Sequence, residues 1–253
     1  FLKCGFDRDN LALTGKPDSD AWFVDYKVTK KAVNHKFNNQ VPLITFFSFG
    51  KFNYLNFFYK GEKRNWLNLA DDYHNVLIEV LSKLNGRVQI AYKLGGKSIR
   101  DYYPGFDRFF QKVIDLNYQD SIIFLDGTTP TIDLLKVSDC ILGFHTLGII
   151  EGMFTDKPIC YGAWGDLFDD IKDTLIPFHK MKGIDVCDNP DNLRDCLIKN
   201  LLTTAKVPYQ REERDKNIEE FLFKADGSSS LRLFKVLKEV YENFNYQNTT
   251  KLY

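Results

Sequence analysis

The sequence lacks a net charge, because 34 lysines and arginines balance 34 aspartates and glutamates over 253 residues. A neutral chain has no overall field that attracts polyanions, so we expect no nucleic acid as a partner. The sequence also lacks any apolar run near the roughly 18 to 20 residues that cross a membrane, and no signal-peptide pattern opens it. We therefore expect no membrane-spanning segment.

Paired cysteines are missing as well. The five cysteines are odd in number and include no CxxC pair: Cys4, Cys140, Cys160, Cys187 and Cys196. Two of them lie in apolar, strand-like runs, where a free thiol behaves as a small hydrophobic group. A reducing, cytoplasmic location is expected. The four histidines are scattered, so the sequence predicts no metal-ligand cluster and no catalytic metal.

Two common nucleotide-binding phrases are also absent. Neither Gly-x-Gly-x-x-Gly nor Gly-x-x-x-x-Gly-Lys-Ser/Thr follows a predicted strand. This argues against an ordinary dinucleotide site and against a P-loop ATPase. With 44% hydrophobic residues the chain is able to bury one large core or two modest ones, so it is globular. It begins at Phe1 rather than Met, and we expect it to be part of a longer protein.

From residue 41 onward, apolar strands alternate with amphipathic helices. Strands are predicted at 41–50, 87–96, 121–127, 140–144, 158–164 and 183–187. Helices are predicted at 66–84, 105–117, 131–138 with Thr131 as cap, 147–154 and 167–175, followed by three helical stretches from residue 191 to the end. This order predicts an α/β fold, a Rossmann-like doubly wound parallel sheet with C-terminal helices.

Three segments are expected along the chain. Residues 1–40 have turn residues and no sustained period, and we interpret them as a connector or irregular entry segment. Residues 41–210 form the Rossmann-like domain. Residues 211–253 form C-terminal helices that pack on this domain or on a partner domain.

Five loops should lie together at one edge of this sheet. Ligands of such sheets bind outside the carboxyl ends of the strands, where helix N-termini present unpaired N–H groups. The loops there are 48–50, 93–96, 126–129, 144–146 and 162–165. Each contains small or hydroxyl-bearing residues, which let the backbone approach a ligand and donate to phosphate. The five loops therefore predict a pocket.

The stretch from 138 to 162 suggests what this pocket binds. Thr146 should begin a helix, where its hydroxyl and the N–H groups of Thr146, Leu147 and Gly148 are placed to hold a phosphate. Glu151 follows one turn later on a similar face and can accept hydrogen bonds from vicinal ribose hydroxyls. These residues predict a nucleotide site.

The run TPTIDLLKVSDCILGFHTLGIIEGMFTDKPICYGAWGD resembles the donor-binding half of GT-B glycosyltransferases of the bacterial surface-polysaccharide type. In that family the C-terminal Rossmann-like domain closes with a phrase of the kind ELL..AD.VI..NST...EAL..GKPVI..G. The similarity is best over residues 126–166. Weaker similarities are LALTGKPDSD, ADGSSSLRLFKVL and CYGAWGD, the last resembling a phrase of capsule Kdo transferases.

The resemblance assigns roles to individual residues. His145 takes the place of an Asn or Ser, Thr146 that of a Ser, and Glu151 that of the ribose-binding glutamate. The nucleotide-sugar site implied in full is Ser48, Lys93, Gly127, Thr128, His145, Thr146, Leu147, Gly148, Glu151 and Trp164. Two positions differ from the family: YKLGGKS keeps only Lys93 of a K.HP phrase, and Gly152 replaces an Ala.

The activity implied is that of a metal-independent GT-B glycosyltransferase, of which this chain is the donor-binding part. A sugar would pass from a nucleotide-sugar to the hydroxyl of a glycan or lipid-linked acceptor, in capsule or lipopolysaccharide biosynthesis, without a cofactor. Helix N-termini and Lys93 would stabilise the leaving phosphate. The catalytic base is not identified, with Asp18, Asp20 and Asp126 as the acids considered.

The resemblance also implies partners and a location. The N-terminal GT-B domain, which carries the acceptor site in such enzymes, is not visible in this sequence. A lipid-linked acceptor would bring the cytoplasmic enzyme to the inner face of the cell membrane as a peripheral protein.

Two other functions stay open. A CDP-polyol phosphotransferase of the teichoic-acid type shares the fold, with attack at phosphorus and two cationic groups near the β-phosphate. A non-catalytic GT-B-like module that binds a sugar or a partner protein is the other alternative.

Each highlighted residue also has a purely structural interpretation. Glu151 would be a helix-start carboxylate, His145 a strand-end histidine, Trp164 a rim aromatic and Lys93 a loop lysine. For Asp126 a turn-forming role is favoured. Asp226 with Ser228–Ser230 is interpreted as a helix cap. Arg232 would contact a phosphate only if that cap faces the cleft.

Overall fold

The computed structural model describes residue 7 and residues 11–49, 57–94, 105–203 and 210–249. The chain divides into two compact units, one of Lys27–Arg214 and one that joins Phe1–Tyr26 with Asp215–Tyr253. The first unit begins before residue 41, the boundary expected from the sequence. The reason is Phe37, which is only 1% exposed and belongs to the same apolar cluster as Leu43.

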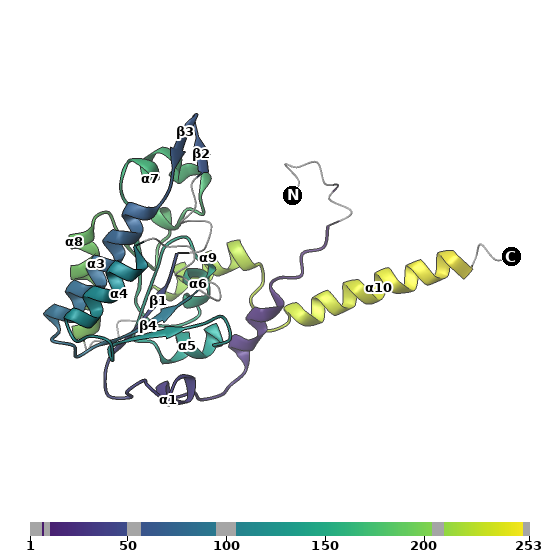
Figure 1. Ribbon diagram of the computed structural model, residues 1–253. Helices are drawn as coiled ribbons and strands as arrows, with labels where there is room; N and C mark the ends of the chain where they lie inside the picture. The colour runs from purple at the N-terminus through teal and green to yellow at the C-terminus, as the bar shows by residue number, and fades with distance from the viewer. Residues whose placement is uncertain (1–6, 8–10, 50–56, 95–104, 204–209, 250–253) are drawn as a thin grey trace. The chain divides into compact units, whose positions relative to one another are not determined.

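The first unit contains a six-stranded sheet in the order β5-β4-β1-β6-β7-β8. Figure 1 labels its strands β1 and β4. Its strands are β1 (Leu43–Phe47), β4 (Gln89–Lys93), β5 (Ile122–Leu125), β6 (Cys140–Gly143), β7 (Ile159–Gly162) and β8 (Asp185–Cys187). All five pairings are parallel. Every residue of β1 is buried, as expected for a central strand. The predicted Rossmann-like α/β fold is confirmed.

Helices cover both faces of this sheet. α3 (Leu67–Lys83) packs with α4 (Phe106–Asp115) and α8 (Pro190–Leu202) on one face. α5 (Thr131–Val137) packs with α1 (Lys30–Val33) and α6 (Leu147–Gly152) on the other (Figure 1). Apolar residues of α3 at helical spacing, such as Leu69, Tyr73 and Leu77, are buried. The apolar face predicted from the sequence is therefore the face that packs in the core.

Several local predictions need correction. Thr131 does not cap α5, because Pro130 holds the cap position and no side-chain cap bond forms. The helix predicted at 147–154 ends at Gly152, and the helix predicted at 167–175 is α7 (Asp166–Ile171) followed by the 3₁₀ turn η4 (Lys172–Thr174).

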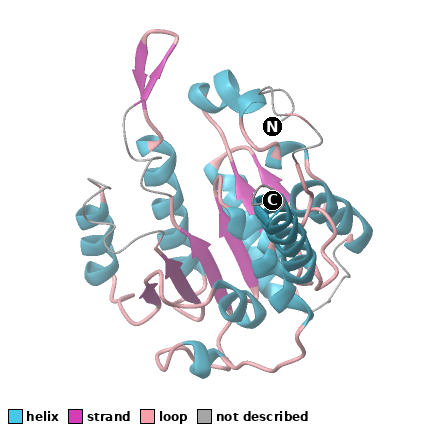
Figure 2. Cartoon of the chain, turned by 90° about the vertical axis from the view of Figure 1, so that its right-hand side faces the viewer, coloured by secondary structure: helices cyan, strands magenta, loops and turns pink. Residues whose placement is uncertain are grey.

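The sequence did not predict a small hairpin of β2 (Phe57–Tyr59) and β3 (Glu62–Arg64). It stands apart from the large sheet (Figure 2). Its turn residues Lys60 and Gly61 both have positive φ, at 49° and 81°, which suits the right-handed twist of a two-residue hairpin. Phe58 is 79% exposed, so the hairpin has no apolar alternation that faces a core.

The second unit is built from η3 (Pro17–Phe23), most of α9 (Arg211–Leu222) and α10 (Ser229–Thr249). Together with α8 of the first unit, α9 and α10 are the three helical stretches that the sequence predicts towards the end of the chain. Asp20 caps α10, because its carboxylate accepts from the amides of Ser229 at 2.9 Å and Ser230 at 2.7 Å. Partial burial raises the pKa of Asp20, but these hydrogen bonds outweigh it and the pKa is lowered.

The predicted cap at Asp226 plays a smaller part. Its carboxylate accepts from the Ser228 amide at 3.0 Å, and both of its oxygens accept from Arg232 Nη1, at 2.8 and 2.9 Å. The Arg232 guanidinium also donates to the carbonyls of Thr14 and Lys224. These contacts occupy Arg232 within the second unit, which disfavours the phosphate role considered for it.

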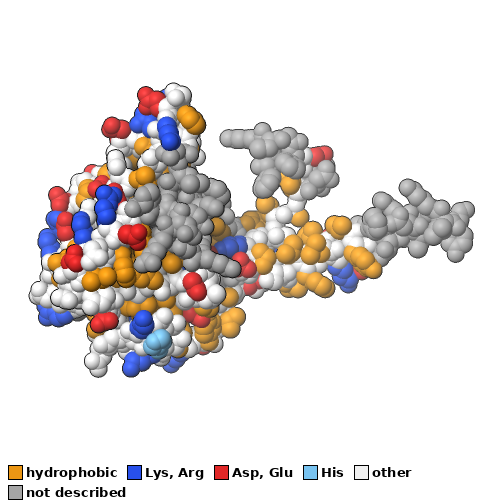
Figure 3. Space-filling model, in the orientation of Figure 1, with side chains coloured by type: hydrophobic (Ala, Val, Ile, Leu, Met, Phe, Trp, Pro, Cys, Tyr) orange, Lys and Arg blue, Asp and Glu red, His pale blue; other side chains and the backbone are white. Residues whose placement is uncertain are grey.

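Apolar side chains of α10 lie on its surface at a spacing of three to four residues (Figure 3). The exposed residues are Leu231, Phe234, Leu237, Val240 and Tyr241. Across the residues that the structure describes, no helix combines the length and the apolar character that crossing a membrane demands.

Candidate functional site

The strand order contains one reversal point, between β1 and β6. The chain leaves β1 towards β4 and β5 on one side, and then returns to β6 on the other. Phe47 of β1 pairs with Gly143 of β6, so the two strands end side by side. In open α/β sheets ligands bind outside the carboxyl ends of strands at such a reversal point. The residues that follow the two strands are Ser48 and Phe49, and Phe144 to Leu147.

His145 is held in an unusual state at this point. Its φ is 45°, in the left-handed region that non-glycine residues seldom adopt. Its Nε2 atom is buried and has no hydrogen-bond partner within the described part of the chain. Burial, and then the charge of nearby His179, lower the pKa of His145 to about 4. The ring is therefore neutral at pH 7, with an unmet hydrogen bond at the end of β6.

Two more polar groups lie around this ring. Tyr161 of β7 is fully buried, and its hydroxyl also lacks a hydrogen-bond partner among the residues described. Its ring centre is 6.5 Å from that of His145 and 5.4 Å from that of Phe178. His179 lies in the 3₁₀ turn η5 (Phe178–Lys180). Both of its ring nitrogens are buried and have no hydrogen-bond partner among the residues described.

Burial first, and then the charge of Lys180, lowers the pKa of His179. We call His145, Tyr161, Phe178 and His179 the imidazole cluster. Buried polar atoms without partners are rare in native proteins, and a ligand is one of the ways in which they are completed. Sequence reasoning missed Tyr161 and His179. Tyr161 could have been found in the sequence, because its hydroxyl is a polar group within an otherwise apolar predicted strand.

The start of α6 is built as the sequence predicted, with one difference. Thr146 is the cap, outside the first turn, and its hydroxyl accepts from the Gly148 amide at 3.2 Å. The Gly148 amide thus already has an acceptor, and binding a phosphate would require an exchange of that bond. Leu147 is 56% exposed, while Glu151 is partly buried one turn further on. The structure brings these four residues together with His145.

Lys93 lies at the end of β4 and is only 8% exposed. Its ammonium donates to the carbonyl of Asp126, and to that of Thr129 at 2.7 Å. Burial lowers the pKa of Lys93, while the charge of Asp126 opposes this shift. The geometry therefore favours a lysine that anchors the 126–129 loop over the predicted phosphate ligand.

The loop after β5 carries Gly127 and Thr128, both exposed. Asp126 Oδ1 accepts from the Thr128 amide at 2.9 Å and from its hydroxyl at 2.5 Å. These bonds, the hydroxyl of Thr128 first, lower the pKa of Asp126. The turn-forming role favoured for Asp126 is seen, and this side chain is engaged within its own loop. Ser48, the residue after β1, is 7% exposed, and its amide donates to the Lys93 carbonyl at 3.0 Å.

Trp164 follows β7 and packs on α3. Its indole Nε1 donates to Asp72 Oδ2 at 2.8 Å, and its ring stacks on Tyr73 with centres 5.6 Å apart. Base stacking by Trp164 stays a prediction. The Tyr73 hydroxyl in turn donates to the Gly162 carbonyl at 2.7 Å and accepts from the Gly162 amide at 2.8 Å. It also lies 3.2 Å from the Gly143 carbonyl, so it braces the ends of β6 and β7.

Removing this hydroxyl should destabilise the sheet edge. We expect Tyr73→Phe to lower the free energy of unfolding by about 1 to 2 kcal/mol, because a buried amide loses its acceptor. The control is Tyr59→Phe, which removes an exposed hydroxyl that donates to the backbone carbonyl of Asp170 at 3.0 Å and should change stability by about 0.5 kcal/mol or less. Urea denaturation of both variants makes the comparison. Equal effects would contradict the bracing role.

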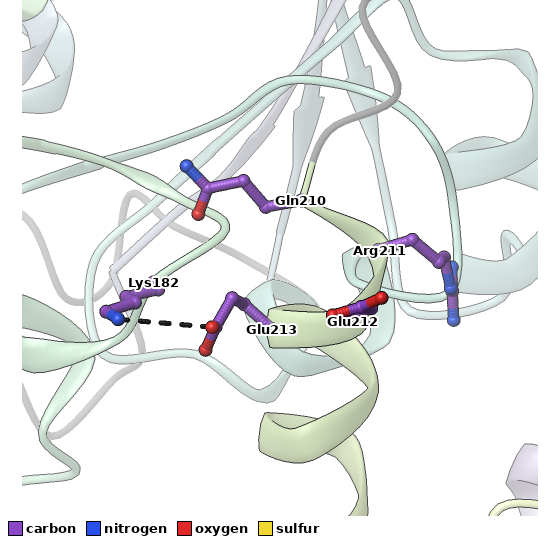
Figure 4. Close-up of a pocket in the computed structure, with 5 residues that line it drawn as sticks. All are labelled: Lys182, Gln210, Arg211, Glu212 and Glu213. Carbon is purple, nitrogen blue, oxygen red and sulfur yellow. Dashed lines mark ion pairs between the residues drawn. The ribbon is translucent and has the colours of Figure 1, made fainter.

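A hollow with a volume of about 700 Å³ lies elsewhere in the described part of the chain (Figure 4). It is lined by Lys182, Gln210, Arg211, Glu212 and Glu213. Lys182 Nζ lies 3.9 Å from Glu213 Oε1, and the Gly183 amide donates to Gln210 Oε1 at 3.0 Å. Lys182 and Gly183 precede β8, so this hollow is at the amino edge of the sheet and not at the carboxyl ends.

No family model matches the sequence, and no curated protein matches it. Solved structures share its fold. The wall teichoic acid polymerase TagF superposes with a TM-score of 0.57 at 14% identity, over 94% of this chain and 54% of TagF. HepE of Anabaena, in complex with UDP and glucose, gives 0.51 at 11% identity, over 88% of this chain and 53% of HepE.

A putative UDP-N-acetylglucosamine 2-epimerase of Listeria monocytogenes gives a TM-score of 0.53 at 14% identity, over 96% of this chain and 57% of the epimerase. The chain thus spans little more than half the length of these proteins. At such identities the likeness concerns the fold alone. These structures confirm the Rossmann-like fold that the resemblance to GT-B glycosyltransferases implied.

Proposed function

We propose that this chain is the donor-binding part of a glycosyltransferase, and that it holds a nucleotide-sugar at the carboxyl ends of β1 and β6. The observation that carries this proposal is His145, a buried imidazole with an unmet hydrogen bond and a left-handed backbone at the reversal point of the sheet. Strain and unpaired polar atoms concentrate where a protein binds ligands. The neighbours support it, since HepE was solved with UDP and glucose and a TagF variant was soaked with CDPG.

The positions of these residues support one role for each. Glu151, one turn into α6, accepts from the ribose hydroxyls of the nucleotide. The hydroxyl of Thr146 and the amide of Leu147 donate to the phosphates, where the start of the helix favours negative charge. His145 is neutral, and in the tautomer that carries its proton on Nε2 this atom donates a hydrogen bond to a phosphate oxygen or sugar hydroxyl without adding a charge.

The proposed reaction is a displacement at the anomeric carbon. The acceptor oxygen forms a bond to this carbon while the bond to the donor phosphate breaks, and the fixed N–H and O–H donors stabilise the charge that the leaving phosphate gains. A base must take the acceptor proton. Asp20 and Asp126 are engaged as a helix cap and a turn, which disfavours both. The acceptor proposed is a bacterial surface glycan such as capsule or lipopolysaccharide.

A CDP-polyol phosphotransferase is the second candidate, and the TM-score of 0.57 with TagF is the observation in its favour. Attack at phosphorus would call for cationic groups near the β-phosphate. In this chain His145 is neutral and Lys93 is bonded to loop carbonyls. Glycosyl transfer therefore fits the residues better than phosphotransfer does.

Calorimetric titration with CMP, CDP, UDP, GDP and their sugar or polyol conjugates tests the proposal. We expect one nucleoside diphosphate to bind, and to stabilise the protein by about 2.7 kcal/mol when present at a hundredfold excess over Kd. Glu151→Ala and His145→Asn should each weaken that binding tenfold or more, equivalent to about 1.4 kcal/mol. Asparagine also tolerates the left-handed backbone of position 145.

The control for this titration is Lys182→Ala, at the opposite edge of the sheet, which should bind as the unchanged protein does. Unchanged affinity in Glu151→Ala and His145→Asn would contradict the assigned site. Binding of no nucleotide by the unchanged protein would contradict the donor-binding function and favour a non-catalytic module.

A further inference from the structure

A second group of chemically reactive side chains lies away from the proposed donor site. The Sγ atoms of Cys160 and Cys196 and a carboxylate oxygen of Asp185 all lie within 4.8 Å of one another. They come from β7, α8 and β8, and are 25 and 11 residues apart along the chain. Such spacing resembles no metal motif, which is why the sequence predicts no cluster of metal ligands.

The distances suit a tetrahedral metal site. The Sγ atoms of Cys160 and Cys196 are 3.5 Å apart. Two thiolates bound to zinc at about 2.3 Å in a tetrahedron are about 3.8 Å apart, so the two sulfurs need little movement to share one ion. Cys140 Sγ lies 3.8 Å from that of Cys160 but outside the group of three ligand atoms, so Cys140 is not counted as a ligand.

Asn200 completes the arrangement. Its Nδ2 lies 2.9 Å from Asp185 Oδ2, 3.4 Å from Cys160 Sγ and 3.5 Å from Cys196 Sγ, so its amide faces all three groups. Turning this amide over would replace the nitrogen by the carbonyl oxygen, which is a metal ligand. Asparagine amide nitrogen and oxygen are close in size, so the turn needs no added space.

Burial gives the site both a dry interior and an entrance. Cys160 is fully buried, whereas Cys196, Asp185 and Asn200 are each partly exposed. β8 is the last strand of the sheet, so an ion can reach the group from that edge. Two thiols and a carboxylate bring up to three negative charges together on binding, which a divalent cation compensates.

We propose that Cys160, Asp185, Cys196 and Asn200 bind a zinc-class divalent cation, and that this ion is structural. Two sulfur and two oxygen ligands suit zinc, which accepts both types in tetrahedral geometry. Asp185 opens β8 and pairs with Cys160, away from the carboxyl ends where the nucleotide is proposed to bind. A closed set of four protein ligands clamps α8 and β8 to β7.

Titration of the reduced, metal-free chain with Co²⁺ tests the site directly. We expect one equivalent to give the intense visible bands of a tetrahedral complex together with thiolate-to-metal charge transfer, and Zn²⁺ to displace it. Cys160→Ser and Cys196→Ser should each lose this signal, and Asp185→Asn should weaken binding at least tenfold. The matched control Cys140→Ser, a buried cysteine outside the three-residue group, should retain it.

A measurement on the unchanged protein avoids dependence on variants that fail to fold. Zn²⁺ should protect Cys196, the partly exposed cysteine of the group, from alkylation under native conditions, and a chelator should restore its reactivity. Co²⁺ binding without thiolate charge transfer, or alkylation of Cys196 that Zn²⁺ does not slow, would overturn the proposal. Neither result depends on whether a nucleotide binds.

Discussion

Replacing Arg214 with methionine should lower the free energy of unfolding by about 3 to 5 kcal/mol, the largest effect we expect from a single side chain. Arg214 is 0% exposed, and its guanidinium donates to three backbone carbonyls. The acceptors are Gly183 at 2.7 Å, Thr155 at 2.7 Å and Lys157 at 2.9 Å. Methionine fills much of the space but leaves these buried carbonyls without their donor.

The matched control is Arg211→Met, in the same helix. Arg211 is partly exposed, and its Nη1 donates to the Met153 carbonyl at 3.1 Å, so we expect a loss of about 1 kcal/mol. Arg214→Lys should recover little of the stability, because a single ammonium does not match the spread of the guanidinium fork. Urea denaturation at neutral pH measures all three. Equal losses in Arg214→Met and Arg211→Met would contradict the anchoring role.

Gly148→Ala should destabilise the protein by about 2 to 3 kcal/mol and weaken the proposed nucleotide binding. A Cβ at this position would lie 2.7 to 2.8 Å from three ring atoms of Phe47, a buried residue of β1. In a helix, alanine is normally more stable than glycine by about 1 kcal/mol. The change in stability expected here is therefore opposite in sign to the one that helix propensity predicts. The clash would push the start of α6, with Thr146 and Leu147, away from the strand ends.

Gly127→Ala is the control for this change, because a Cβ there meets nothing within 4 Å, and stability should change by about 0.5 kcal/mol or less. The double variant Phe47→Leu with Gly148→Ala should be less destabilised than the sum of the two single variants, since the smaller side chain makes room. Strict additivity, or a stabilising Gly148→Ala, would show that the close approach of α6 to β1 is not what requires glycine.

Much of the fold was predictable because it depends on local patterns. Fully apolar runs mark strands that are covered on both faces, as β1 shows, and the helical spacing of Leu69, Tyr73 and Leu77 marks the buried face of α3. Alternation of the two then leaves few topologies, since βαβ crossovers are right-handed and place all carboxyl ends at one edge. The loops of the candidate site follow from this rule, and its residues from 145 to 151 lie in one continuous stretch.

The hairpin β2–β3 escaped prediction because its strands have three residues each and no buried face. The roles of Lys93 and Asp20 escaped it for another reason. Lys93 holds carbonyls more than 30 residues away, and Asp20 caps a helix 209 residues further along the chain. A charged residue in a loop has the same sequence signal whether it binds a ligand or an internal carbonyl.

The sequence by itself determined the parallel α/β sheet and the helix start at Thr146, because strand and helix periodicity act between residues close along the chain. Only the tertiary structure decided the buried Arg214, the imidazole cluster and the meeting of Cys160, Asp185 and Cys196. Each of these joins groups from separate elements of the fold. Their contacts depend on how those elements pack, and no local pattern of residues encodes such packing.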